Sequence, residues 1–206
     1  IDLSRFEGVV SNGKLRSEYQ IPADYAIIGN VSALAPHKDY QTFVDTAKIL
    51  VAKGLKAKFI AIGEGPSRKE IEEYIDRQGM QGHIILTGFR RDVPALLKEL
   101  DLFLITSKTE GLGTSILDAL ASEVPVVATK AGGIVEVIEH EVCGLLCEVQ
   151  EPNQLAESVN RMLSDAALRS TCIAGGMKKV KKFSKSETAK KSFAIYEEVL
   201  SSSDKA

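Results

Sequence analysis

Short apolar runs alternate with stretches of helical periodicity over the first three quarters of the chain. Runs rich in β-branched residues, such as "AIIGNVS" and "AKFIAIG", predict buried strands. The expected strands lie at 26–32, 57–63, 83–88, 101–107 and 124–129, with a shorter one at about 144–148. Continuous apolar strands separated by helices are typical of a parallel sheet covered on both faces. The pattern therefore predicts an α/β fold with a Rossmann-like, doubly wound parallel sheet.

Between and after these strands, apolar positions recur every three or four residues. Helices are expected at 40–51 with Asp39 as N-cap, around 71–75, at 92–100 and from about 113. From Pro152 the pattern is wholly helical, with helices expected at 153–163, on to about 182, and at 187–200. Residues 201–206 are expected to be a frayed, disordered tail. One domain over 1–206 with an all-helical C-terminal extension is predicted.

Composition limits the classes of protein that this chain can represent. It has 206 residues, 44% of them hydrophobic, and a formal net charge of -2, so it can bury a substantial core and is not an electrostatically driven nucleic-acid or membrane binder. No apolar run approaches the ~20 residues of a membrane span, and no secretory leader is visible. We expect a cytoplasmic protein without a transmembrane segment. Because the chain starts at Ile1 without a methionine, we also expect a piece of a longer protein.

The three cysteines, Cys143, Cys147 and Cys172, form a sparse and odd set. Disulfide scaffolds are cysteine-dense, so a reducing compartment is favoured. A metal site built from Cys143, Cys147 and the histidines is conceivable, but the spacing matches no zinc signature. Buried cysteine behaves mostly as a small hydrophobe, so core packing and no metal are expected.

The loop "TSKTEGLGTS" follows the fourth strand and leads into a helix. Helix N-termini attract anions, by up to ~2 kcal/mol per charge, and glycine at 111 and 113 lets a phosphate approach the backbone. Glu110 and Asp118 bracket this start, and carboxylates near a phosphate suit the hydroxyl groups of a sugar. An alternative is purely structural, because Ser115 and Asp118 fit the S/T-x-x-D/E capping pattern.

Other loops at the same sheet edge add possible ligand contacts. Lys38 stands before a helix, where its ammonium could neutralise a phosphate, whereas His37 is interpreted as a solvated loop residue. In "GFRRDVP", Phe89 and Arg90 could cradle a nucleobase. The alternative is an exposed loop whose Asp92 caps the next helix, and the two readings are evenly balanced.

Several other motifs are excluded as sites. "GEGP" lacks the third glycine of a dinucleotide fingerprint, and Pro66 at helix position N1 explains it. "KKVKK" is interpreted as a solvated helix face. No hydrolase nucleophile–base pair or P-loop ending is present, so the visible chemistry is binding of a phosphorylated, hydroxyl-rich ligand.

The stretch "SKTEGLGTSILDALASEVPVVATKAGGIVEVIEHEVCGLLCE" resembles the signature region of retaining GT-B glycosyltransferases, the glycosyl transferases group 1 of sequence family four. That family reads S-x-x-E-G-F-G-x-x-x-x-E-A-M-A-x-G-x-P-V-V-A-T, then G-G-x-x-E-x-I and G-x-L. Its two glutamates fall on Glu110 and Asp118 here. "GEGPSRKEIEEYI", "IDLSRF" and the terminal helices resemble further family segments in the expected order.

The resemblance implies the C-terminal, donor-binding domain of a two-domain hexosyltransferase, with no metal and no cofactor. A nucleoside diphosphate sugar would donate its sugar, with retention, to a glycan or lipid held by an N-terminal domain, in polysaccharide or glycan biosynthesis. Glu110 would contact the donor sugar, and Asp118 the ribose. The remaining donor-binding residues implied are Lys38 at the diphosphate, Phe89 and Arg90 at the base, and Gly111, Leu112, Gly113 and Thr114 near the sugar and distal phosphate. The isolated domain is expected to transfer little or nothing.

The chain departs from the family where a glycine and an arginine usually end the first strand. Ser32 and Ala33 stand there, so one cation that clamps the diphosphate is missing, at a cost of ~1.5–3 kcal/mol. His37, Arg90, Arg91 or the absent domain could substitute for it. Two other functions stay open: half of a nucleotide-sugar epimerase, and a non-enzymatic nucleotide-binding module.

Overall fold

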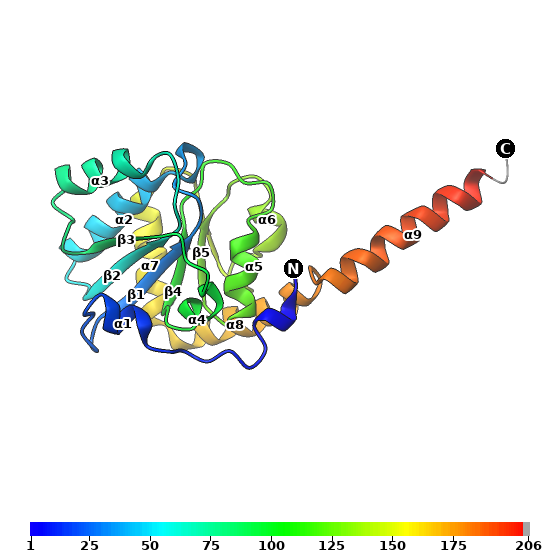
Figure 1. Ribbon diagram of the computed structural model, residues 1–206, viewed down its shortest axis with the longest axis horizontal. Helices are drawn as coiled ribbons and strands as arrows, with labels where there is room; N and C mark the ends of the chain where they lie inside the picture. The colour runs from blue at the N-terminus through cyan, green and yellow to red at the C-terminus, as the bar shows by residue number, and fades with distance from the viewer. Residues whose placement is uncertain (204–206) are drawn as a thin grey trace.

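The computed structural model describes residues 1–203 and contains a parallel sheet in the order β3-β2-β1-β4-β5-β6 (Figure 1). The strands are β1 (Ala26–Val31), β2 (Ala57–Ile62), β3 (Ile84–Gly88), β4 (Leu102–Ile105), β5 (Val126–Thr129) and β6 (Leu145–Cys147). Every neighbouring pair is parallel. The predicted doubly wound sheet is confirmed, and its strand order is that of dinucleotide-binding Rossmann folds.

Helices cover both faces of the sheet. They are α1 (Lys14–Glu18), α2 (Tyr40–Ala52), α3 (Arg68–Arg77), α4 (Val93–Leu97), α5 (Thr114–Ala121), α6 (Ile134–Val137), α7 (Pro152–Ser164), α8 (Ala166–Lys181) and α9 (Lys185–Ser203), with 3-10 turns at Leu3–Arg5 and Pro36–Lys38. One apolar core lies beneath α2, α3 and α7. The other lies beneath α1, α4, α5 and α6, and includes Val180 of α8. A sheet buried on both faces explains why its strands are almost continuously apolar.

The sheet reverses its winding direction between β1 and β4. β1 pairs with β2 on one side and with β4 on the other, so the loops that follow β1 and β4 diverge to opposite faces. Ligands of open α/β sheets bind in the crevice that opens at such a point. Asp39 lies at the end of the loop that follows β1 and is the N-cap of α2, as predicted. Its carboxylate accepts hydrogen bonds from the N–H and, at 2.7 Å, the hydroxyl of Thr42.

The structure corrects several expected boundaries. α4 ends at Leu97, although a helix was expected over 92–100, and the short helices α1 and α6 were not expected because five and four residues show no apolar period. Pro66 does not occupy position N1, since α3 begins at Arg68 after a turn from Gly65. Residues 201–203 belong to α9 instead of fraying, and 204–206 lie outside the described residues.

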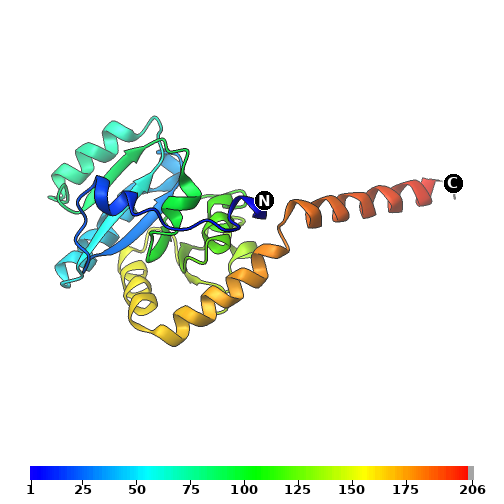
Figure 2. The ribbon, with the colours of Figure 1, turned by 60° about the horizontal axis from the view of Figure 1, so that its bottom comes forward.

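Helix α9 projects away from the sheet and its covering helices (Figures 1 and 2). Four of its large apolar side chains are 60–68% exposed: Phe193, Ile195, Tyr196 and Leu200. Over residues 1–203, no helix is long and apolar enough to cross a membrane.

The cysteines pack in the interior, as expected. Cys143, Cys147 and Cys172 are free thiols and buried, and burial raises the pKa of each thiol. Within the described part of the chain, no cluster of histidine, cysteine and carboxylate side chains could hold a metal ion.

Candidate functional site

Lys38 and Glu110 meet at the switch point of the sheet. The Lys38 Nζ lies 2.5 Å from Glu110 Oε1, and the two side chains are only 15% and 8% exposed. The hydroxyl of Ser107 donates to the same carboxylate oxygen at 2.8 Å. The structure thus brings together the predicted phosphate-neutralising cation and the predicted sugar-binding carboxylate, from loops 72 residues apart.

The buried hydroxyl groups of Thr106 and Thr129 form hydrogen bonds that connect the loops after β1 and β4 with the end of β5. Thr106 Oγ1 donates to the backbone oxygens of Lys38 and Asp39, at 3.1 and 3.0 Å. Thr129 Oγ1, at the end of β5, donates to the Ser107 carbonyl at 2.7 Å. Sequence reasoning missed Thr106, Ser107 and Thr129. Their only sequence signal is a hydroxyl residue at or just beyond the end of an apolar strand.

Two glycines of the "KAGG" stretch support the loop from its other side. The Gly133 N–H donates to the Glu110 carbonyl at 3.0 Å. A Cβ at Gly132 would lie 2.1 Å from the Glu110 carbonyl oxygen, and one at Gly133 would lie 1.8 Å from that of Gly111. Neither position accommodates a side chain. The backbone at Gly132 and Gly133 therefore packs directly against the backbone of Glu110 and Gly111 and fixes the position of that loop.

Helix α5 begins without a side-chain cap. Its N-cap is Gly113, at φ +69°, and Ser115 and Asp118 do not form the capping pair that the alternative reading required. The first N–H groups of a helix have no partner inside it, and those at Thr114 and Ser115 find no acceptor within residues 1–203. Thr114 is exposed and Leu112 half-buried. The start of α5 therefore offers unpaired donors to an anion.

Gly111 is not required by the fold. It lacks a positive φ, and a Cβ built there meets no heavy atom within 4 Å. A side chain would instead occupy the open space in front of the uncapped helix. That a ligand approaches the backbone here stays a prediction.

Asp118 is a half-buried carboxylate on the first turns of α5. Within the described chain it has neither a hydrogen-bond donor nor an ion-pair partner at contact distance. Burial raises the pKa of its carboxyl group, and the positive charges of Arg5 and the N-terminal amine partly counteract this. A desolvated carboxylate without a partner is typical of a functional site.

Replacing Asp118 by asparagine is expected to stabilise the folded chain at neutral pH. In the folded chain the pKa of Asp118 lies above its ordinary value of 3.8. The protonated carboxyl group therefore stabilises the fold fully below pH 3.8, and this contribution to the free energy of unfolding is lost as the pH rises through the folded pKa. The stability advantage of the variant should therefore grow with pH. Urea unfolding between pH 4 and 8 measures it, with Asp76→Asn at an exposed position as control. An advantage independent of pH would contradict this account.

A cavity of about 280 Å³ lies beside the ends of β1 and β2. Ser32, Ala33, Gly63 and Phe89 line it together with neighbouring residues, and the Phe89 ring is 72% exposed. This is the position expected for a nucleobase. A larger hollow of about 750 Å³ lies elsewhere, between the N-terminal segment and the start of α9, and contains none of the predicted site residues.

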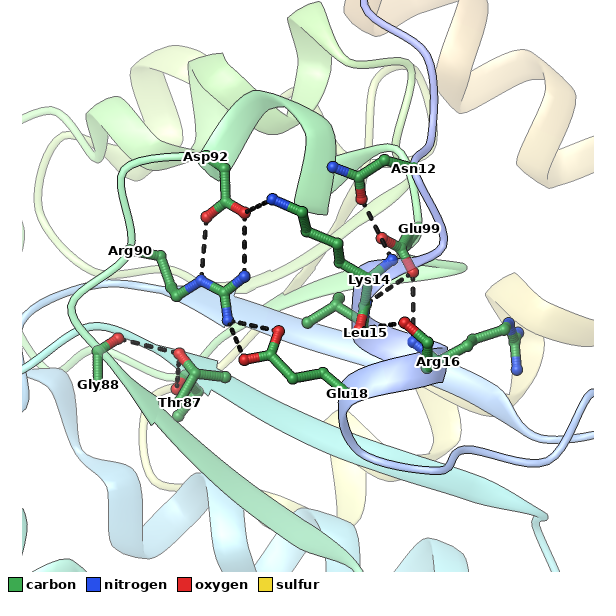
Figure 3. A network of polar contacts seen from close by, with 12 residues as sticks. Asn12, Lys14, Leu15, Arg16, Glu18, Thr87, Gly88, Arg90, Asp92 and Glu99 are labelled. Carbon is green, nitrogen blue, oxygen red and sulfur yellow. Dashed lines mark hydrogen bonds and ion pairs between the residues drawn. The ribbon is translucent and has the colours of Figure 1, made fainter.

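Arg90 lines this cavity but its guanidinium is already occupied (Figure 3). It donates to both carboxylate oxygens of Asp92, at 3.0 and 2.9 Å, and to both of Glu18, at 2.9 and 2.8 Å. Asp92 accordingly makes no side-chain cap for α4, so the capping alternative is wrong. The guanidinium is therefore not free to replace the family arginine, and the Arg90 backbone N–H and carbonyl make no hydrogen bond within residues 1–203.

Ser32, which stands in place of the family glycine, belongs to a short chain of hydrogen bonds with Tyr40 and Asn30. The Ser32 hydroxyl lies 2.8 Å from the Tyr40 hydroxyl, which donates to buried Asn30 Oδ1 at 3.3 Å. Burial raises the pKa of Tyr40 to about 12, so it stays a neutral donor.

Ala33 is exposed, as are His37 and Arg91. The basic side chains nearest to Ala33 along the chain are those of Lys38 and His37. A third, Lys108, holds its ammonium 3.5 Å from Asp39 Oδ1.

The strand order defines a Rossmann-like α/β domain, and the uncapped α5 at the switch point leaves its first N–H groups unpaired within the described residues. The family model of glycosyl transferases group 1 matches residues 11–179, so the chain belongs to that family. Its solved neighbours are GT-B glycosyltransferases, and the chain corresponds to their C-terminal domain, which confirms the resemblance drawn from the motifs.

Curated relatives and solved structures agree on this placement. N-acetyl-α-D-glucosaminyl L-malate synthase of Bacillus anthracis is 31% identical over 75% of this chain and 40% of its own length. HepE of Anabaena, solved with UDP and glucose, is 27% identical at a TM-score of 0.83, over 98% of this chain and 55% of its own. The C-terminal domain of LpcC from Francisella tularensis is 28% identical at a TM-score of 0.77, over 90% of this chain and 99% of its own. The chain thus spans about half the length of the full-length relatives.

Proposed function

We propose that the chain is the donor-binding half of a retaining hexosyltransferase that uses a nucleoside diphosphate sugar. The acceptor, a glycan or a lipid, would be held by an N-terminal domain, and the product would serve polysaccharide or glycan biosynthesis in the cytoplasm. The bound UDP and glucose of HepE support the choice of a nucleotide sugar.

The observation that carries this proposal is that α5 starts uncapped at Gly113, three residues after Glu110, whose carboxylate pairs with Lys38. The α5 N–H groups and the Lys38 ammonium are positive groups that would stabilise the charge developing on the diphosphate leaving group. Glu110 is an acceptor for sugar hydroxyls, and Asp118 for those of the ribose. No metal takes part in this scheme.

The proposed order of contacts is the one that the family resemblance implies. The cavity at Phe89 would take the base, and Asp118 the ribose. The diphosphate would lie against Gly111, Leu112, Gly113 and Thr114, with Lys38 beside it. The sugar would then project toward Glu110, whose carboxylate is already oriented by Ser107. An ammonium has three donors, so Lys38 can keep Glu110 while it contacts a phosphate.

The missing family arginine favours one other function, a non-enzymatic nucleotide-binding module. The Arg90 guanidinium is occupied by the carboxylates of Glu18 and Asp92, so it does not take the place of the family arginine. A full-length protein that binds nucleotide but turns over no sugar donor with any acceptor would have this second function.

Gly111→Ala is expected to weaken nucleotide binding by about 10-fold or more without changing stability, because the added methyl group occupies ligand space only. Calorimetric titration of the chain with UDP, GDP and ADP measures this and identifies the base. The control is Gly82→Ala, where a Cβ also meets nothing within 4 Å, far from the switch point. Absence of binding by all three nucleotides to the folded wild-type chain would contradict the proposed function.

A further inference from the structure

Arg90 is held between two carboxylates that come from different parts of the chain. Asp92 is its near neighbour in sequence, whereas Glu18 ends helix α1, 72 residues earlier. In Figure 3 the guanidinium lies between them, and the Lys14 ammonium lies beside Asp92. Lys14 Nζ donates to Asp92 Oδ2 at 3.3 Å. The Arg90 side chain is only 14% exposed, whereas those of Asp92 and Glu18 are 27% and 46% exposed, so the guanidinium is the shielded side of these charge-assisted bonds.

Helix α1 is itself anchored. The carboxylate of Glu99 accepts from the backbone N–H groups of Leu15 and Arg16, at 3.0 and 3.4 Å, and so caps α1 at its start (Figure 3). The Leu15 side chain is fully buried in the core. Glu18 therefore extends toward Arg90 from a helix with a fixed position.

Phe89 lies between two constrained neighbours. Gly88 has φ +75°, and its carbonyl accepts from the Gly63 N–H at 3.0 Å. Arg90 is held by Glu18 and Asp92 on the other side. The Phe89 ring nevertheless stays 72% exposed at the rim of the cavity. A rigid backbone that presents an exposed phenylalanine to a cavity suits stacking on a flat, aromatic ligand.

We propose that Glu18 is a positioning residue for the nucleobase: through Arg90 it holds Phe89 where the ring stacks on the base of the nucleotide. This inference rests on the proposed function, since it needs a nucleotide in the cavity. It assigns Arg90 a role in ordering the loop, and gives helix α1 a part in ligand recognition although α1 lines no part of the cavity.

The chain has no tryptophan, so Phe89→Trp introduces a single fluorescent probe at the rim. Binding of UDP, or of whichever nucleotide calorimetry selects, should quench this tryptophan. In the same background, Glu18→Gln should raise the dissociation constant about 3- to 10-fold and lower the tryptophan anisotropy of the unliganded chain. The matched control is Glu141→Gln, which breaks a pair with Arg161; its side chain is 47% exposed, against 46% for Glu18. The control should change neither quantity.

Calorimetry on Glu18→Gln with Phe89 intact completes the test, and Glu18→Gln combined with Phe89→Ala should bind no more weakly than Phe89→Ala alone. Equal dissociation constants and anisotropies with and without Glu18 would overturn the inference and leave the proposed function standing. Calorimetric binding without quenching of Trp at position 89 would also overturn it. Failure of the wild-type chain to bind any nucleotide would contradict the proposed function itself.

Discussion

Gly133→Ala is expected to lower the free energy of unfolding by about 1–3 kcal/mol, the usual cost of forcing extra volume into a packed site. The new Cβ would lie 1.8 Å from the Gly111 carbonyl oxygen, which is backbone and cannot rotate away. The Glu110–Leu112 loop must move, and with it the hydrogen bond from Gly133 N–H to the Glu110 carbonyl. Urea or thermal unfolding measures the loss.

Gly82→Ala again provides the control, because its Cβ meets no atom and its backbone is not left-handed. It should stay within about 0.5 kcal/mol of the wild type. If Gly133→Ala were as stable as Gly82→Ala, the loop would be free to shift, and the assignment of "KAGG" as its fixed support would be wrong.

Lys38→Met is expected to weaken binding of a nucleoside diphosphate by about 10- to 150-fold, which corresponds to the ~1.5–3 kcal/mol of a charged hydrogen bond. Methionine keeps much of the lysine's length but removes the ammonium that pairs with Glu110 and that is proposed to contact the diphosphate. Binding of the nucleoside alone should change little, because Lys38 lies beside the predicted phosphate position and not the base cavity. Calorimetry with UDP and with uridine separates the two contributions.

Loss of Lys38 also leaves the 8%-exposed Glu110 carboxylate without its cation, which could disturb the fold. The double variant Lys38→Met with Glu110→Gln removes both charges and should recover stability but not diphosphate binding. Lys130→Met is the matched control, since its exposed ammonium pairs with Glu148 at the neighbouring strand end. UDP affinity that stays unchanged in Lys38→Met would refute the role proposed for Lys38.

The strand and helix pattern alone was enough to predict the sheet, its doubly wound class and the loops that carry the site. Apolar runs and helical periodicity are local properties, so α2, β1 and β2 lie within a residue or two of their expected bounds. Because ligands bind at the carboxyl ends of strands, Lys38 and Glu110 could be placed at one edge before any motif was considered.

The pairings of side chains could not be predicted. Which carboxylate holds Arg90 depends on the path of residues 1–25, a segment with no clear periodicity and a helix of only five residues. The support that Gly133 gives to Gly111 depends on how two loops stack in three dimensions. Sequence spacing does not encode such contacts between distant segments. The capping reading of Asp118 failed for the same reason, since two geometries fit one local pattern.

Helix α9 gives the domain two very different levels of local stability. Its described side chains from Thr188 to Leu200 are all exposed, so its helicity depends on intrinsic propensity and on local pairs such as Lys190 with Glu187. Most helical stability in proteins comes from tertiary packing, which these exposed side chains do not provide. The amides of α9 can therefore exchange with solvent by local opening that leaves the sheet intact, whereas those of β1 and β4 exchange only when the whole core unfolds.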